Sequence, residues 1–301
     1  MPTVEVSHID KNFGAMRAVD DVSFSVDKGE IFGLLGPNGA GKTTAIRIIL
    51  DIFKADRGEV SVLGGKINEA AKNRIGYLPE ERGLYQDIPL ERCLVYLATL
   101  KGLSTSEARK RVGVYLECFD LASARAKKVK ELSKGMQQKA QLIVTLVHQP
   151  DLIIIDEPFS ALDPVNTQMV KDLLREQRSQ GVTIVMCTHQ MHQVEELSDR
   201  LVLIDHGKVM LYGSLADIRR RFASHDLLVR AAGALPASLP GVQRFEPVNG
   251  SMRLVLAPGT SSQEVLRTLI DQNVILEQFE MAVPTLDEIF IRVVQGEGAQ
   301  P

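Results

Sequence analysis

The stretch Gly36-Pro37-Asn38-Gly39-Ala40-Gly41-Lys42-Thr43-Thr44 decides the fold of this 301-residue chain. Its spacing is GxxxxGK[ST], a pattern that closes a glycine-rich loop around phosphate groups. The apolar run Ile31–Leu35 comes directly before the loop, and residues with helical spacing follow it. A strand, this loop and a helix in that order present successive backbone N–H groups to an anion. The sequence therefore predicts an α/β domain that binds a nucleotide through residues 36–44.

Two residues of this loop have their own chemical tasks. We expect Lys42 to reach the β- and γ-phosphates of ATP and the Thr43 hydroxyl to bind Mg²⁺. The glycines allow the backbone to curl closely around the phosphates. Thr43 is thus the first predicted metal ligand.

Two carboxylates, Asp156 and Glu157, follow a second apolar run, Leu152–Ile155. Carboxylates at the end of a buried strand are typical of a ligand crevice. Asp156 is predicted to hold Mg²⁺, directly or through water. Glu157 is then placed to polarise the water that attacks the γ-phosphate.

The rest of the chain divides by its patterning. The runs Thr183–Cys187 and Leu201–Ile204 indicate further buried strands of a mostly parallel sheet. Helical spacing over about residues 86–146 predicts a helical subdomain inserted into the α/β domain. We expect the α/β domain to cover residues 1–222, a small α+β domain to cover 226–296, and a disordered tail to cover 297–301.

Composition narrows the classes of partner. A net charge of −3 gives no sign of a nucleic-acid partner. The cysteines Cys93, Cys118 and Cys187 form no CxxC pair and are expected to be free, buried thiols, as suits a reducing cytoplasm. No apolar run approaches the roughly 18 residues of a membrane span, so work at a membrane would require a separate membrane-crossing polypeptide.

A third motif precedes the carboxylates and looks like the start of a helix: Leu132-Ser133-Lys134-Gly135-Met136-Gln137-Gln138. It resembles the LSGGQ signature of ABC ATPases. Other positions match that family in the correct order. They are Phe13 for the aromatic that stacks on adenine, Glu80 for the glutamine of the Q-loop, Ser160 to Asp163 for the D-loop, and His189 for the switch histidine that contacts the γ-phosphate.

The resemblance covers about residues 3–222, and residues 226–301 resemble the accessory domain of some ABC-2-type exporter ATPases. The segment from Gly76 to Tyr85 is similar to the sodium-extrusion branch. The resemblance implies the fold of a P-loop ABC ATPase and an ATP-hydrolysing subunit that powers export through a separate membrane permease. It also implies a location in the cytoplasm, at the inner face of the cell membrane.

The resemblance further implies that ATP is held between two such subunits. The catalytic residues would be Glu157, His189 and Lys42, and Ser133 and Gly135 of one subunit would close the nucleotide site of the other. The second subunit would be an identical copy or a paralogue. No nucleic-acid partner is expected.

Two positions depart from the family pattern. Glu80 replaces a glutamine, and we expect its carboxylate to be a third metal ligand, beside Thr43 and Asp156. Lys134 replaces a glycine of the signature and either faces the nucleotide of the partner subunit or lies in solvent at a helix start.

Two other functions fit the sequence less well. A soluble ABC-type ATPase that acts on nucleic acid or the ribosome usually has a long coiled-coil insertion or a second ATP domain, and neither is present. A regulatory module without turnover is disfavoured because Glu157 and His189 are both intact. The transported cargo stays open, since it would be recognised by the permease.

Overall fold

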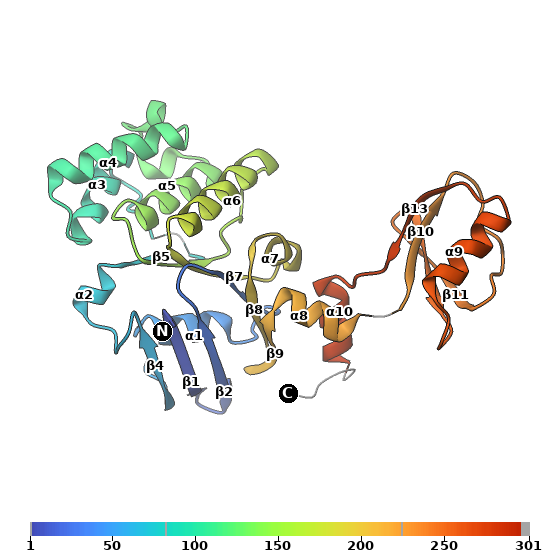
Figure 1. Ribbon diagram of the computed structural model, residues 1–301. Coiled ribbons are helices and arrows are strands. Elements are labelled where there is room, and N and C mark those ends of the chain that lie inside the picture. Colours follow the sequence, from blue (N-terminus) through green and yellow to red (C-terminus); the bar gives the residue numbers. More distant parts are fainter. Residues whose placement is uncertain (1, 82, 224, 296–301) are drawn as a thin grey trace. The chain divides into compact units, whose positions relative to one another are not determined.

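The computed structural model describes residues 2–295, except residues 82 and 224. The chain forms two compact units, one up to Leu215 and the other from Ala216 onward (Figure 1). The expected disordered tail, 297–301, lies outside the described residues.

A six-stranded sheet with the order β5-β6-β7-β3-β8-β9 forms the centre of the first unit. All neighbours pair in parallel except β9, which runs antiparallel to β8. Strands β3, β6 and β7 are buried along their whole length, which explains their continuous apolar sequences. The predicted α/β fold with a mostly parallel sheet is confirmed. The strands are β3 (Ile31–Leu35), β5 (Ile75–Leu78), β6 (Leu152–Asp156), β7 (Thr183–Thr188), β8 (Arg200–Asp205) and β9 (Lys208–Ser214).

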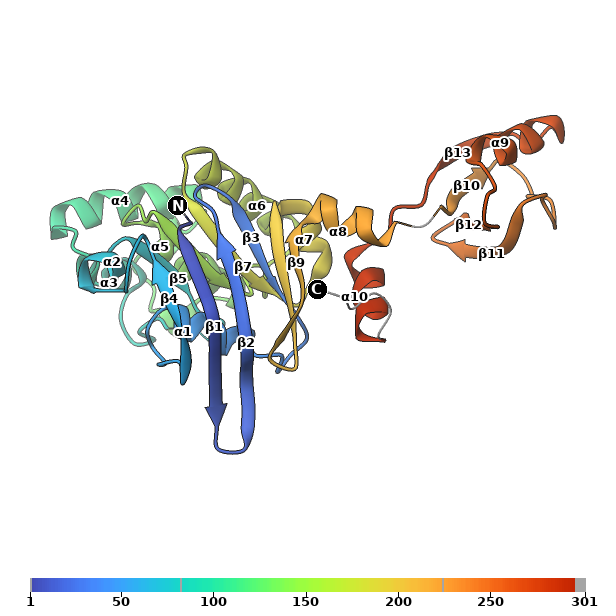
Figure 2. The same cartoon turned by 60° about the horizontal axis from the view of Figure 1, so that its bottom comes forward.

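A second, antiparallel sheet has the order β2-β1-β4 and consists of β1 (Val4–Phe13), β2 (Met16–Val26) and β4 (Arg57–Val62). Figure 2 shows β1 and β2 as a long hairpin. The main apolar core contains residues of both sheets and of helix α1 (Lys42–Ile49), among them Val6, Phe32 and Ile46. The loop at residues 36–41 therefore joins two elements that are held by one core.

Helices α3, α4 and α5 pack on one another within residues 90–146. Ser104 accepts a hydrogen bond from the backbone N–H of Glu107 at the start of α4. Near the end of α4, Cys118 is exposed, so the prediction of three buried thiols is wrong for this residue. The helices of the first unit are α1, α2 (Glu69–Lys72), α3 (Leu90–Leu100), α4 (Thr105–Cys118), α5 (Lys134–Leu146), α6 (Pro164–Ser179) and α7 (Met191–Leu197), with 3₁₀ turns at Ala122–Ala124 and Val129–Glu131.

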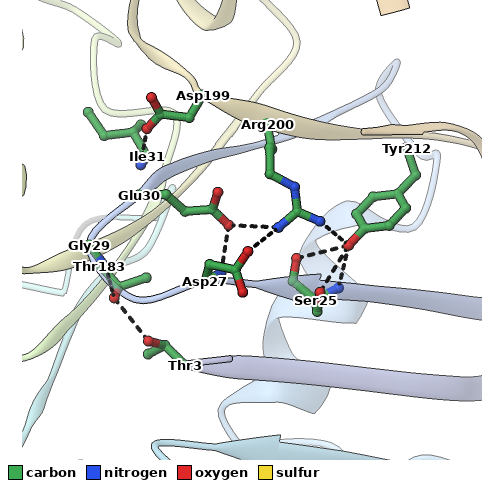
Figure 3. A network of polar contacts seen from close by, with 10 residues as sticks. All are labelled: Thr3, Ser25, Asp27, Gly29, Glu30, Ile31, Thr183, Asp199, Arg200 and Tyr212. Carbon is green, nitrogen blue, oxygen red and sulfur yellow. Dashed lines mark hydrogen bonds and ion pairs between the residues drawn. The ribbon is translucent and has the colours of Figure 1, made fainter. Parts of the chain in front are cut away.

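A polar network at the amino end of β3 ties the two sheets together (Figure 3). Arg200 on β8 donates to Asp27 Oδ2 at 2.9 Å and Glu30 Oε1 at 3.3 Å, and also to the hydroxyl of Tyr212. The Tyr212 hydroxyl in turn accepts from the backbone N–H of Ser25 on β2 at 3.1 Å. One guanidinium group thus connects strands of both sheets.

The second unit contains the antiparallel sheet β11-β12-β10-β13. Leu254 on β12 and Val265 and Leu269 on α9 belong to its small apolar core. Thr285 and Glu288 form a reciprocal capping box at the start of the last helix. The elements are α8 (Leu215–Phe222), β10 (Leu227–Ala231), β11 (Val242–Val248), β12 (Ser251–Leu256), α9 (Ser262–Asp271), β13 (Leu276–Met281) and α10 (Leu286–Val294).

Candidate functional site

The glycine-rich loop turns sharply between β3 and α1 because two glycines adopt backbone angles that side chains disfavour. Gly36 has φ +150° and Gly41 has φ +103°. A Cβ on Gly36 would lie 2.1 Å from the carbonyl oxygen of Ile204, and one on Gly41 would lie 2.3 Å from that of Ala18. Neither position can accept a larger residue without moving the backbone. The loop is therefore held tightly against β2 and the end of β8.

Lys42, the first residue of α1, is 7% exposed and folds back over its own loop. Its ammonium group donates to the carbonyl oxygens of Gly36 at 2.8 Å and Pro37 at 3.0 Å. These contacts hold the ammonium group over the loop. An ammonium group has three donors and no acceptor, which suits phosphate oxygens as replacement partners.

The Thr43 hydroxyl donates to Asp156 Oδ2 at 3.2 Å. Asp156 is the last residue of β6 and is 2% exposed. Burial raises the pKa of the Asp156 carboxyl, hydrogen bonds from Cys187 and Thr43 lower it, and the charge of Glu157 raises it. The fold thus brings together two of the predicted metal ligands and keeps the carboxylate in a desolvated position.

Glu157 follows β6 with φ +51° and has its carboxylate among residues at the end of β7. Its Oε1 lies 2.6 Å from Nδ1 of His189 and accepts from the His189 backbone N–H at 2.9 Å. Its Oε2 accepts from the Thr188 hydroxyl at 3.0 Å. The loop after β3, the carboxylates after β6 and the histidine after β7 therefore meet at the carboxyl edge of the sheet, where ligands bind in open parallel sheets.

A cleft of about 620 Å³ opens along this edge. Predicted site residues that line it are Asn38, Gly39, Ala40, Gly41, Lys42, Thr43, Thr44, Glu80, Asp156 and Glu157. Glu80 is an exposed residue just beyond β5, so its carboxylate is accessible from the cleft.

Five further residues line the cleft and belong to no recognisable sequence motif: Met16, Arg17, Ala18, His206 and Gly207. The turn between β8 and β9 is fixed to the loop by a hydrogen bond from Gly207 N–H to the Ala40 carbonyl at 2.9 Å. In the sequence, the dipeptide His206-Gly207 after an apolar run indicates this turn, but it does not indicate which residues the turn contacts.

Several predicted residues are not among those that line the cleft as the structure describes it. Phe13 ends β1, is 42% exposed, and contacts Phe53 edge-on with ring centroids 5.6 Å apart. Gly36 and Pro37 form the base of the loop, and His189 reaches the site through Glu157.

Ser133 and Gly135 lie at the amino end of α5. Ser133 is exposed and caps the helix by accepting from Met136 N–H at 3.2 Å. Lys134 is exposed beside it. Gln138 of the same helix donates to the Pro158 carbonyl at 3.2 Å, which connects α5 to the turn that follows Glu157.

The donor set near the loop fits Mg²⁺. Thr43, Asp156 and Glu80 supply hydroxyl and carboxylate oxygens, which this hard cation prefers. Among the described residues there is no group of three or more His, Cys, Asp or Glu side chains arranged to hold a metal.

Comparison of the sequence with known families gives two matches. Residues 19–160 match the family described as ABC transporter, and residues 213–294 match the C-terminal domain of proteins like the ATP-binding proteins DrrA1-3. None of the helices in the described ranges combines the length and apolar character that a membrane crossing requires.

Individual relatives align over almost the whole chain. The ABC transporter ATP-binding protein YhaQ of Bacillus subtilis is 40% identical, with 96% of this chain and 97% of that protein covered. The daunorubicin resistance ATP-binding protein DrrA3 of Streptomyces coeruleorubidus is 31% identical, with 96% and 95% covered. The Nod factor export ATP-binding protein I of a Rhizobium species is 32% identical, with 98% and 97% covered.

A solved structure described as the ATP-binding subunit of an ABC transporter is similar in fold. It shares 34% sequence identity with this chain and a TM-score of 0.69, over 73% of this chain and 93% of that one.

Proposed function

The chain belongs to the family of ABC transporter ATP-binding proteins, and from this premise we propose that it works in pairs to power export through a separate membrane permease. It is the ATP-hydrolysing subunit of a transporter. The relatives named for daunorubicin resistance and Nod factor export support the direction of transport. They also favour a transporter over an ATPase that acts on nucleic acid or the ribosome.

One observation carries the proposed chemistry: Lys42, Thr43, Asp156 and Glu157 line a single cleft at the carboxyl edge of the sheet. The ammonium group of Lys42 and the backbone N–H groups of the loop are suited to bind the phosphates of ATP. The carboxylate of Glu157 is the group positioned to activate water.

The proposed reaction is hydrolysis of the γ-phosphoryl group. Lys42 exchanges its contacts with the Gly36 and Pro37 carbonyls for oxygens of the β- and γ-phosphates. Glu157 accepts a proton from water as the water oxygen bonds to the γ-phosphorus. The bond between that phosphorus and the β–γ bridging oxygen breaks, which gives ADP and inorganic phosphate.

Mg²⁺ would neutralise charge on the phosphate oxygens when bound. We propose Thr43, Asp156 and Glu80 as the residues that hold it, on the basis of their oxygen donors and their place along the cleft. His189 keeps Glu157 oriented through its contact with Oε1 and reaches the γ-phosphate when the nucleotide is bound.

We propose that the site is completed by a second subunit, identical or paralogous. The exposed Ser133, which caps α5, and Gly135 in the first turn of that helix support this role, because the amino end of a helix attracts a phosphate. Phe13 would stack on the adenine. The pair would lie at the inner face of the membrane, against the permease.

The substitution Glu157→Gln tests the proposal. We expect hydrolysis by the purified chain to fall by at least about a hundred-fold, because the amide cannot accept the proton. ATP binding should persist, and the variant should elute as an ATP-bound pair in size-exclusion chromatography. Glu176→Gln, at an exposed glutamate on α6, is the matched control. Full turnover by Glu157→Gln would refute the assignment of the base.

A further inference from the structure

We propose that Thr188 is a positioning residue for Glu157, which its hydroxyl holds in the orientation required to activate water. This inference rests on the proposed role of Glu157 as the general base. Thr188 is the last residue of β7 and is 1% exposed. It is not among the described residues that line the cleft, and its hydroxyl donates to the Glu157 carboxylate.

The direction of the Thr188 hydroxyl is fixed by two hydrogen bonds. Its oxygen accepts from the backbone N–H of Gln190 at 3.1 Å and lies 3.0 Å from Glu157 Oε2. A hydroxyl has one hydrogen. The backbone N–H of Gln190 is a donor and cannot accept this hydrogen, so the hydrogen points to Oε2 of Glu157. The β-branched side chain of threonine has few rotamers, which keeps the hydroxyl in this place.

The two oxygens of Glu157 are held in different ways. Oε2 is bound by Thr188, which the protein buries, whereas Oε1 is bound by His189, whose side chain is 49% exposed. The histidine ring can move out toward solvent or a nucleotide, but the threonine cannot. Because the backbone N–H of His189 also donates to Oε1 at 2.9 Å, Thr188 is the side-chain contact that persists when the ring moves.

The main chain of Glu157 is also held by β7. Glu157 has φ +51°, and its N–H donates to the Cys187 carbonyl at 2.9 Å. That bond attaches the main chain of Glu157 to β7 one residue before Thr188. Main chain and carboxylate are thus both held by the end of the same strand, which leaves little freedom for the carboxylate to turn away. A base that is oriented by a third group is the general arrangement of such sites.

The test compares Thr188→Val with Thr188→Ser in the purified full-length chain. Valine has a similar shape but no hydroxyl, so we expect kcat for ATP hydrolysis to fall by about ten- to a hundred-fold, as for loss of one hydrogen bond to a charged group. KM and the Kd of a fluorescent ATP analogue should stay within about twofold, since the phosphate loop is untouched. Serine restores the hydroxyl and should recover most of the lost kcat.

The same strand offers a matched control, Thr183→Val. Thr183 is also 1% exposed, and its hydroxyl contacts Thr3 and the Gly29 N–H at the far end of β7 (Figure 3). A loss of a buried hydroxyl there perturbs packing equally but leaves Glu157 in place. We expect its kcat to stay within about twofold of the unchanged chain. Circular dichroism checks folding, and Thr188→Ala, which adds no atoms, repeats the test if the valine variant does not fold.

Three outcomes would overturn the inference: an unchanged kcat in Thr188→Val, equal losses in Thr188→Val and Thr183→Val, or a serine variant as slow as the valine variant. Glu157→Gln, measured alongside, separates the two proposals. If Glu157→Gln is inactive while Thr188→Val is fully active, only the role of Thr188 fails. If Glu157→Gln turns over normally, the base assignment fails, and the role of Thr188 fails with it.

Discussion

Asp156 illustrates at the scale of one residue how binding competes with stability. Its carboxylate is almost fully buried, and burial raises its pKa, so the folded chain without nucleotide holds the ionised form at a cost. This cost is consistent with the proposed role of Asp156 as a ligand for Mg²⁺.

Asp156→Asn should therefore raise the unfolding temperature of the nucleotide-free protein. The amide removes the buried charge and can still accept from Thr43, so we expect a rise of about 2–4 °C, the equivalent of roughly 1 kcal/mol in a unit of this size. Addition of Mg²⁺ and ATP should stabilise the variant less than the unchanged chain. Differential scanning fluorimetry with and without EDTA measures both effects, and a lower unfolding temperature without nucleotide would contradict the first.

Glu80 is the second residue whose charge can be tested alone. Because it lines the cleft and is exposed, Glu80→Gln keeps the shape of the side chain while removing one negative charge near the phosphates. We expect the Mg²⁺ concentration for half-maximal ATPase activity to rise about fivefold, or roughly 1 kcal/mol. Titration of Mg²⁺ at fixed ATP measures this value, and a superimposable curve would remove Glu80 from the metal ligands.

At the scale of the element, His148 connects the end of α5 to the start of β5. Its Nε2 lies 3.2 Å from the Ile75 carbonyl oxygen, which also accepts from Lys101 at 3.0 Å. Burial, and after it the charge of Lys101, lowers the pKa of His148 from 6.5 to about 4. The helical group is thus joined to the sheet by a histidine that stays neutral in the folded chain.

This histidine should make the protein sensitive to acid. The unfolded state binds the proton more tightly, so the stability that the neutral ring contributes is present above pH 6.5 and is lost as the pH falls toward 4. Between pH 7.5 and 5 the loss is about 2 kcal/mol. His148→Gln should lose correspondingly less stability over that range in urea titrations. Parallel pH profiles for the two proteins would contradict this prediction.

Elements differ in how well their sequences reveal them. The strands β3, β6, β7 and β8 could be predicted because a strand that is buried on both faces has an uninterrupted apolar sequence. The sheet of β1, β2 and β4 was not predicted. Its register shifts, such as the one between Val6 and Ile9, interrupt the alternation of apolar and polar residues that marks a one-sided strand.

The site shows the same limit. Lys42, Thr43, Asp156 and Glu157 could be singled out because each lies in a local motif beside a buried strand. Thr188 and Gly207 could not, because their importance comes from contacts with residues distant in sequence, Glu157 and Ala40. Local spacing carries no information about such pairs.

At the scale of the whole molecule, the network around Arg200 is the clearest link between the two sheets of the first unit (Figure 3). Arg200→Met keeps much of the packing of the side chain on Phe32 and Tyr212 but leaves the buried Glu30 without its cation. We expect a loss of about 2–3 kcal/mol in the free energy of unfolding of this unit.

The control for this prediction is Arg74→Met, which removes an ion pair with Asp151 whose two side chains are both more than half exposed. That change should cost less than about 1 kcal/mol. Urea unfolding followed by circular dichroism compares the two variants. Equal losses would mean that the network around Arg200 adds nothing beyond an ordinary surface pair.

The position of β3 has a consequence for synthesis of the chain. This strand, which leads into the phosphate loop, pairs only with β7 and β8, and the loop itself is held by Gly207. All of these partners are translated long after Lys42. At a synthesis rate of about 5–20 residues per second, these partners are complete on the order of ten seconds or more after Lys42 is added. We therefore expect a nascent chain that is interrupted before Gly207 to bind ATP poorly, because the residues that hold the loop are not yet present.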